Sequence, residues 1–158
     1  MTPSLIRANV VAERISWIRR MLASIQGLPL QSYDAFLSDR RNVAAAESYL
    51  RRGIEALLDL GRHILAKGFA LAVTEYKDIG YKLAEEKVLS QDHGNLLRQI
   101  AGYRNRMVHF YHEISNEELY RLCTEDLKDL ETILEGLIAW LHDNPDKLDE
   151  FPDPEIRS

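Results

Sequence analysis

The sequence predicts an all-α protein built as an antiparallel bundle of four or five helices. Apolar residues recur at alternating steps of three and four along most of the chain, which is the spacing of one buried helix face. No segment shows the two-residue alternation that is typical of a half-buried strand. Five prolines and eight glycines in 158 residues are few, so long helices can run without internal breakers.

The first expected helix ends at Gly27 and Pro29. Its buried face consists of Ala8, Val11, Ile15, Ile18, Leu22 and Ile25. A second helix is expected to start after Ser38 as its N-cap and to run to Lys67 and Gly68, a length of about 45 Å. Its buried face consists of Val43, Ala46, Leu50, Ile54, Leu57, Gly61 and Ile64.

Three further helices complete the expected bundle. Residues 78–89 form a short helix, and Ser90 then caps a fourth helix. The fourth helix buries Leu97, Ile100, Tyr103, Met107 and Val108. A capping box at Ser115 and Glu118 opens a final helix that is expected to reach about His142. The final helix buries Leu119, Cys123, Leu127, Leu130, Leu134, Leu137 and Leu141.

Residues 1–144 are therefore expected to form one helical domain, and residues 145–158 a flexible acidic tail that has little to bury. The N-terminal stretch is interrupted by charged residues, so we expect no signal peptide and no membrane association. A single cysteine fits a reducing cytoplasm. The net charge of -5 argues against a DNA-binding protein or any general electrostatic grip on nucleic acid, so an RNA contact must be local.

The segment whose side chains are suited to catalysis lies at the end of the fourth helix. Four polar residues are crowded together there, namely Arg104, Asn105, His109 and Tyr111. RNA cleavage needs a base that removes the 2′-hydroxyl proton and a cation that stabilises the phosphate, and His109 and Arg104 supply these groups without a metal or other cofactor. Asn105 and His109, four residues apart, share a helix face. Arg104 is turned from His109 by about 140°, so it reaches the imidazole only if the helix frays.

Two charged patterns on the second helix remain open to two interpretations each. Arg40, Arg51 and Arg62 are spaced by eleven and form a ridge, which indicates either a local RNA-binding strip or ion pairing along the helix. Glu55, Asp59 and His63 are spaced by four. This second stripe is compatible with a metal site, although we favour a solvated stripe or the lining of a cleft and expect no bound metal.

The motif Arg104-x4-His109 resembles the signature of the HEPN family, and the fuller pattern of Arg104, Asn105, His109 and Tyr111 resembles the HepT-like toxin branch of that family. The upstream segments 46–47 and 54–64 also resemble this branch. The resemblance implies a HEPN-like bundle that forms a symmetric homodimer, with both 104–109 segments facing one cleft that cuts single-stranded RNA. It also implies a minimal nucleotidyltransferase as antitoxin, which attaches AMP to Tyr111 and forms a hetero-oligomer with the toxin.

We therefore expect a toxin of a type II toxin-antitoxin pair that acts as a metal-independent endoribonuclease. His109 is the expected general base and acid, Arg104 stabilises the phosphate, and Asn105 orients the imidazole. Arg40, Arg51, Glu55 and Asp59 are candidates for binding RNA or lining the cleft. Two alternatives remain, namely a non-catalytic module that binds nucleotide or substrate for a nucleotidyltransferase, and a purely structural helical dimer. The sequence contains no glycine-rich phosphate loop, so nucleotidyl transfer must come from the partner.

Overall fold

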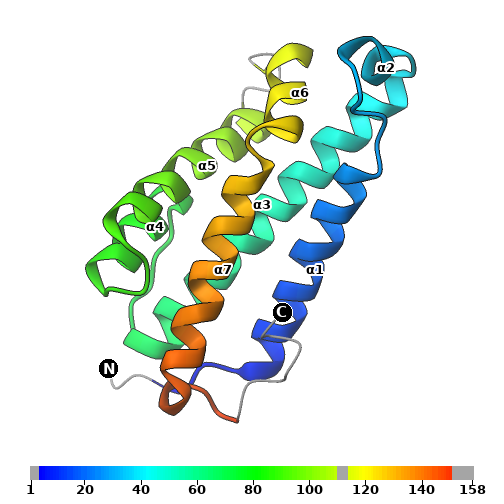
Figure 1. The fold of residues 1–158 in the computed structure, drawn as a ribbon. Helices are drawn as coiled ribbons and strands as arrows, with labels where there is room; N and C mark the ends of the chain where they lie inside the picture. Colours follow the sequence, from blue (N-terminus) through cyan, green and yellow to red (C-terminus); the bar gives the residue numbers. More distant parts are fainter. Residues whose placement is uncertain (1–3, 110–113, 151–158) are drawn as a thin grey trace.

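A computed structural model describes residues 4–109 and 114–150, and the regular elements within these residues are helices (Figure 1). The all-α expectation is confirmed. Apart from the helices, the described residues contain an isolated backbone bridge between Ile6 and Leu148. The helices are α1 (Ala8–Gln26), α2 (Tyr33–Leu37), α3 (Arg40–Phe69), α4 (Tyr76–Glu85), α5 (Gln91–His109), α6 (Asn116–Thr124) and α7 (Leu127–Asp143), followed by a 3-10 turn, η1 (Pro145–Lys147).

Helix α3 is the centre of the bundle and packs against every other α-helix. It runs antiparallel beside α1, with Gly53 against Met21 and Gly68 against Ile6 (Figure 1). Helices α4 and α5 form the other closely packed pair. At their crossing the backbones of Gly80 and Gly94 approach so closely that a Cβ on Gly94 would lie 2.7 Å from the carbonyl oxygen of Gly80.

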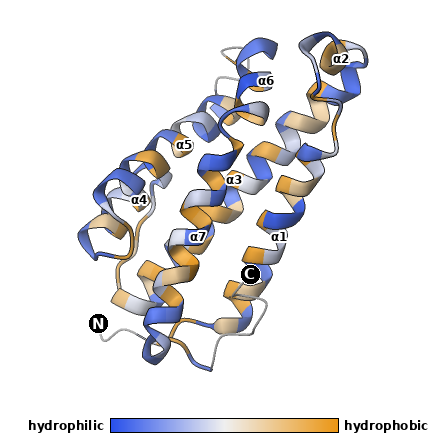
Figure 2. Ribbon diagram, viewed as in Figure 1, coloured by the Kyte–Doolittle hydropathy of each residue, from blue (hydrophilic) through white to orange (hydrophobic). Residues whose placement is uncertain are grey.

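The apolar stripes expected from the sequence form the core. Every residue expected on the buried faces of the first and final helices is buried. Orange and blue residues alternate along the long helices in Figure 2, as expected for helices with one buried side. Val108 is an exception, since 39% of its surface is exposed next to the end of α5. Burial raises the pKa of Cys123 to about 12, which keeps this thiol protonated and fits its expected place on the buried face of the final helix.

Several expected helix boundaries were wrong, among them those of residues 78–89, where α4 instead runs from Tyr76 to Glu85. Helix α3 is capped by Asp39, whose carboxylate accepts the N–H of Arg41 at 2.9 Å, whereas Ser38 ends the short α2 that the sequence did not predict. At its other end α3 passes Gly68 and stops at Ala70, which has a left-handed conformation with φ of 56°. Gly68 instead allows the close approach of Ile6.

The expected final helix is divided into α6 and α7 at Glu125 and Asp126. The apolar spacing runs through this break without interruption, so periodicity alone could not reveal it. The hydroxyl of Thr124 donates to the carbonyl of Tyr120 at 2.8 Å, and the backbone N–H of Asp129 donates to the carbonyl of Asp126 in the first turn of α7. The Thr124 hydroxyl competes with helical hydrogen bonding in this way, which favours a helix end, whereas Asp126 makes no side-chain cap bond.

The described part of the expected tail is packed. Ile6 exchanges backbone hydrogen bonds with Lys147 and Asp149, at 2.8 and 2.9 Å, and Leu148 is buried. Residues 145–150, which were expected to have little to bury, therefore pack against the start of α1. Within the described residues no helix is both long and apolar enough to cross a membrane.

Candidate active site

Arg104 is held in place on α5 by three contacts. Its Nε donates to Glu55 Oε1 on α3 at 3.3 Å, and its Nη1 donates to Asn105 Oδ1 at 3.2 Å. Its guanidinium carbon lies 4.7 Å from the centre of the Tyr76 ring, within cation–π range. Only 20% of the side chain is exposed. Arg104 therefore has one defined orientation, and among its described contacts none engages Nη2.

Tyr76, the first residue of α4, belongs to this site although the sequence analysis did not identify it. Its hydroxyl donates to Asp59 Oδ1 at 2.9 Å, and its ring also lies 4.5 Å from the guanidinium carbon of Arg62. Burial, and secondarily the bond to Asp59, raise the pKa of Tyr76, so the phenol stays protonated and keeps donating. Because these contacts join α3, α4 and α5 in space, no sequence spacing signals them.

The three arginines of the ridge on α3, Arg40, Arg51 and Arg62, differ in whether they form ion pairs. Arg51 bonds to Glu47 at 3.3 Å and lies 3.5 Å from Glu55. Arg62 lies 3.6 Å from the carboxylate of Asp59 and packs over the ring of Tyr76. Arg40 is exposed at the first turn of α3. Two of the three arginines are thus neutralised within the fold, which favours ion pairing over an RNA-binding strip at the ridge. Glu55 and Asp59 line the Arg104 site, as their spacing allowed.

His109 is the last residue of α5 and is exposed. The helix continues through this residue, so the expected fraying between Arg104 and His109 does not occur. The two side chains leave the helix about 140° apart. Asn105 is related to both residues, because it contacts Arg104 and lies one helical turn before His109 on the same helix face. Tyr111 lies outside the described residues.

An ion pair connects the two sides of the segment that follows His109. Arg106 on α5 donates from Nη1 and Nη2 to both carboxylate oxygens of Glu118 on α6, at 2.7 and 2.9 Å. These hydrogen bonds are the main reason that the pKa of Glu118 is lowered. Half of the expected capping box is present, since Ser115 Oγ accepts the N–H of Glu118 at 3.1 Å while the Glu118 carboxylate turns to Arg106. The flanks of residues 110–113 are therefore fixed to each other.

The third member of the acidic stripe, His63, does not join Glu55 and Asp59. Its Nε2 accepts the backbone N–H of Arg7 at 3.1 Å, so the imidazole contacts the residue that precedes α1. Burial is the main cause of the lowered pKa of His63, followed by nearby cations. Within the part of the chain that the structure describes, no group of three or more histidine, cysteine or acidic side chains could hold a metal ion. A metal site on this stripe is not supported.

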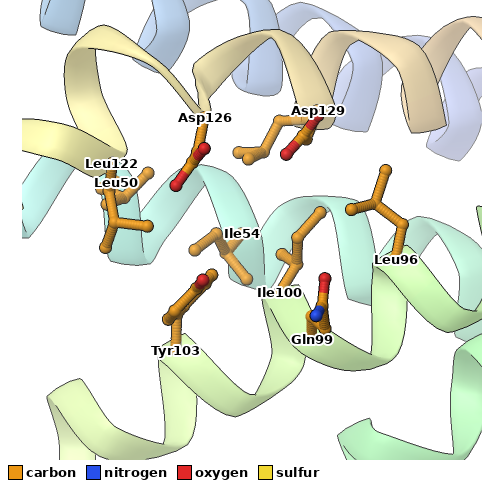
Figure 3. Close-up of a pocket in the computed structure, with 10 residues that line it drawn as sticks. Leu50, Ile54, Leu96, Gln99, Ile100, Tyr103, Leu122, Asp126 and Asp129 are labelled. Atoms are coloured by element: carbon orange, nitrogen blue, oxygen red, sulfur yellow. The ribbon is translucent and has the colours of Figure 1, made fainter.

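A cavity of about 110 Å³ lies on the other side of α5, between α3, α5 and the break of α6 and α7 (Figure 3). Asp126 and Asp129 point into its opening in Figure 3. Binding pockets for drug-sized molecules usually measure about 300–1,000 Å³, so this cavity is small for a nucleotide, and the two carboxylates would repel phosphate. The cavity therefore gives no support to the nucleotide-binding alternative. Its lining is Leu50, Ile54, Leu96, Gln99, Ile100, Tyr103, Leu122, Asp126, Asp129 and Leu130.

Residues 13–137 match a family model described as ribonuclease HepT-like, which spans most of the chain and includes the Arg104 site. The chain belongs to the HepT-like family. The resemblance that Arg104, Asn105 and His109 indicated is thereby confirmed. No curated protein matches this HepT-like chain.

Solved structures share the HepT-like fold at low sequence identity. The tri-AMPylated HEPN toxin of Shewanella oneidensis, in complex with the MNT antitoxin, is 23% identical, with 82% of this chain and 97% of that chain covered at a TM-score of 0.74. A toxin-antitoxin structure with AMP-PNP is 21% identical, with coverages of 81% and 97% at a TM-score of 0.71. The cytosolic protein YutE of Bacillus subtilis, of unknown function, is 21% identical, with coverages of 85% and 90% at a TM-score of 0.70.

Proposed function

We propose that this HepT-like chain is a metal-independent endoribonuclease and the toxin of a cytoplasmic toxin-antitoxin pair. The observation that carries the proposal is the fixed orientation of Arg104. Glu55 and Asn105 take Nε and Nη1, Tyr76 supports the guanidinium, and Nη2 is left for a phosphate oxygen. Arginine remains charged at any physiological pH and binds phosphate in a defined geometry.

In the proposed reaction the neutral imidazole of His109 removes the proton of the RNA 2′-hydroxyl. The 2′-oxygen then attacks the adjacent phosphorus, and Arg104 stabilises the negative charge that accumulates on the non-bridging oxygens. The bond from phosphorus to the 5′-oxygen breaks, and the imidazolium returns its proton to this leaving oxygen. The products are a 2′,3′-cyclic phosphate and a 5′-hydroxyl, and protons and electrons balance without water or metal.

The proposed site requires two copies of the chain. Arg104 and His109 project about 140° apart on one continuous helix, so a single chain does not aim both groups at one phosphodiester. In a symmetric dimer the 104–109 segments meet across the two-fold axis, and Arg104 of one protomer approaches the His109 of its partner. Val108, exposed next to His109, supplies apolar surface for this contact.

The purified, unmodified protein should cut single-stranded RNA in buffer that contains EDTA. Electrophoresis of labelled RNA, with phosphatase and kinase treatment of the fragments, identifies the expected cyclic phosphate and 5′-hydroxyl ends. The same RNA with 2′-O-methyl groups should remain intact, because it lacks the nucleophile. Absence of cleavage across a panel of RNAs, or activity that depends on an added divalent ion, would contradict the proposal.

We propose that a nucleotidyltransferase antitoxin inactivates this toxin by attaching AMP to Tyr111. The proposal is supported by the tri-AMPylated state of the Shewanella oneidensis toxin in its complex with the MNT antitoxin. An attached phosphate would compete with substrate for Arg104. The hydrogen bonds of Arg106 to Glu118 join α5 to α6, the two helices between which Tyr111 lies in the sequence.

Tyr111→Phe should abolish AMP addition without weakening the helical fold. Intact-mass spectrometry after co-expression with a cognate nucleotidyltransferase should show whole AMP units on the natural chain and none on the variant. Tyr81→Phe is the matched control, because Tyr81 is also a tyrosine and is 52% exposed on α4. AMP retained on Tyr111→Phe, or lost equally from Tyr81→Phe, would contradict this assignment.

A further inference from the structure

The net charge of the protein is unevenly distributed. Helix α1 and its N-cap carry four arginines against the single carboxylate of Glu13. Residues 115–143, which form α6 and α7, carry eight acidic residues against two cations. Helices α1 and α3 lie side by side (Figure 1), so the cations of α1 and those on the outer side of α3 form one surface. We call Arg7, Arg14, Arg20, Arg52 and Lys67 the α1–α3 cationic face.

The cations of this face differ from most of the arginines discussed above. Arg51, Arg62, Arg104 and Arg106 are each bound to a carboxylate. In the described part of the chain, no member of the cationic face forms an ion pair with a carboxylate. The four arginines of the face are exposed, and Lys67 is half-buried. Their charges are therefore available to a partner.

The cations also converge at the half-buried His63. The backbone N–H of Arg7 donates to His63 Nε2 at 3.1 Å, which joins the start of α1 to α3. Besides burial, the cations Lys67, Arg7 and Arg14 lower the pKa of His63, while Asp149 acts in the opposite direction. A bound polyanion would neutralise the three cations and raise this pKa. His63 is thus a built-in reporter of anion binding to the face.

An aromatic side chain lies among the cations. Trp17 is partly exposed on α1, and the guanidinium carbon of Arg20 is 5.5 Å from its ring. Both residues line a shallow depression together with Glu13, Arg14 and Ser16. Exposed aromatic rings between cations are typical of surfaces on which the bases of single-stranded nucleic acid stack, whereas phosphates contact the cations.

We propose that the α1–α3 cationic face binds single-stranded RNA beyond the scissile phosphodiester. This inference rests on the proposed ribonuclease function and gives its substrate a second contact surface. Arg52 and Glu55 are three residues apart on α3, or about 60° around the helix axis, so the face begins next to the carboxylate that holds Arg104. RNA is favoured over an acidic protein partner because Trp17 offers a flat stacking surface among the cations.

The test measures binding of a fluorescent 2′-O-methyl oligouridylate, which the proposed chemistry cannot cut, by fluorescence polarisation at several salt concentrations. The double variant R14E/R20E should bind at least about tenfold more weakly and lower the slope of log Kd against log salt by about 1.4, since each lost single-strand phosphate contact removes about 0.7. Trp17→Leu keeps an apolar side chain but should also weaken binding about tenfold. The matched control K87E/K128E changes charge equally, using exposed lysines outside the face, and should leave Kd unchanged.

The position of the contact is tested by NMR titration of His63. The oligonucleotide should raise the pKa of His63 in the natural chain and leave it unshifted in R14E/R20E. If the natural chain binds but does not cut RNA, the ribonuclease proposal fails and the cationic face stands. Equal binding by all variants, no binding by the natural chain, or a loss of antitoxin binding instead of RNA binding in R14E/R20E would overturn the inference.

Discussion

Arg104→Ala and His109→Ala should each reduce RNA cleavage by about a hundredfold or more. A positioned acid or base contributes about 10²- to 10⁴-fold to such reactions, and a donor to the developing phosphate charge contributes about 10²- to 10³-fold. Arg104→Lys should recover little of the activity, because an ammonium group cannot contact Glu55, Asn105 and a phosphate oxygen in the geometry that the guanidinium fork provides.

Gel-based rates with excess RNA measure this loss, and circular dichroism shows whether the helices remain. We expect Arg104→Ala to fold, because Glu55 keeps Arg51 as a partner and is partly exposed. Lys128→Ala, which removes an exposed cation on α7, should retain full activity. Cleavage that survives in His109→Ala would rule out the imidazole as the base.

Mixing the two inactive variants should restore cleavage. If Arg104 and His109 act across the two-fold axis, each mixed dimer has one site with both natural residues. Random exchange then yields about a quarter of the natural activity, since about half of the dimers are mixed and each has one of its two sites intact. No recovery after verified subunit exchange would show that both groups come from one chain, and the geometry of α5 would have to change on binding RNA.

The sequence predicts the main features of the fold because the buried faces are regular. The residues expected on the buried faces of the first and final helices are all buried, and Val43 is the one member of the α3 face that is only partly covered. Boundaries were less predictable. The spacing of buried residues continues from Cys123 to Leu127 across the break between α6 and α7. The periodicity of apolar residues therefore gives no sign that one helix ends here and another begins.

For the candidate site, the sequence indicated the residues on α5 and α3 but not their contacts. Glu55 and Asp59 were recognised by their spacing, whereas Tyr76 was missed because its ring reaches Arg104 through the packing of α4 on α5. The helical state of residues 104–109 was also not predictable. Side-chain crowding suggested a frayed end, yet α5 continues to His109 and separates the two groups that the sequence placed together.

Gly80→Ala should destabilise the protein by about 3 kcal/mol, at the upper end of typical overpacking costs, and lower Tm by about 10 °C. A Cβ at this position would collide with the carbonyl oxygen of Gly94, and would lie 3.2 Å from both the Arg98 nitrogen and Leu97 Cβ. Because the obstacle is mainly backbone, α4 must move away from α5 as a unit. Tyr76, one turn before Gly80, would move with it and loosen Arg104, so we expect RNA cleavage to fall together with stability.

Gly102→Ala on α5 separates this steric effect from the general effect of removing a helical glycine. A Cβ on Gly102 would meet no atom within 4 Å, so this substitution should stabilise the protein by about 0.5–1 kcal/mol through the lower entropy of the unfolded chain. Thermal and urea unfolding of both variants measure the contrast. Equal stability changes in the two variants would mean that α4 and α5 do not cross as closely as the glycine pair requires, and the support that Tyr76 gives Arg104 would lose its structural basis.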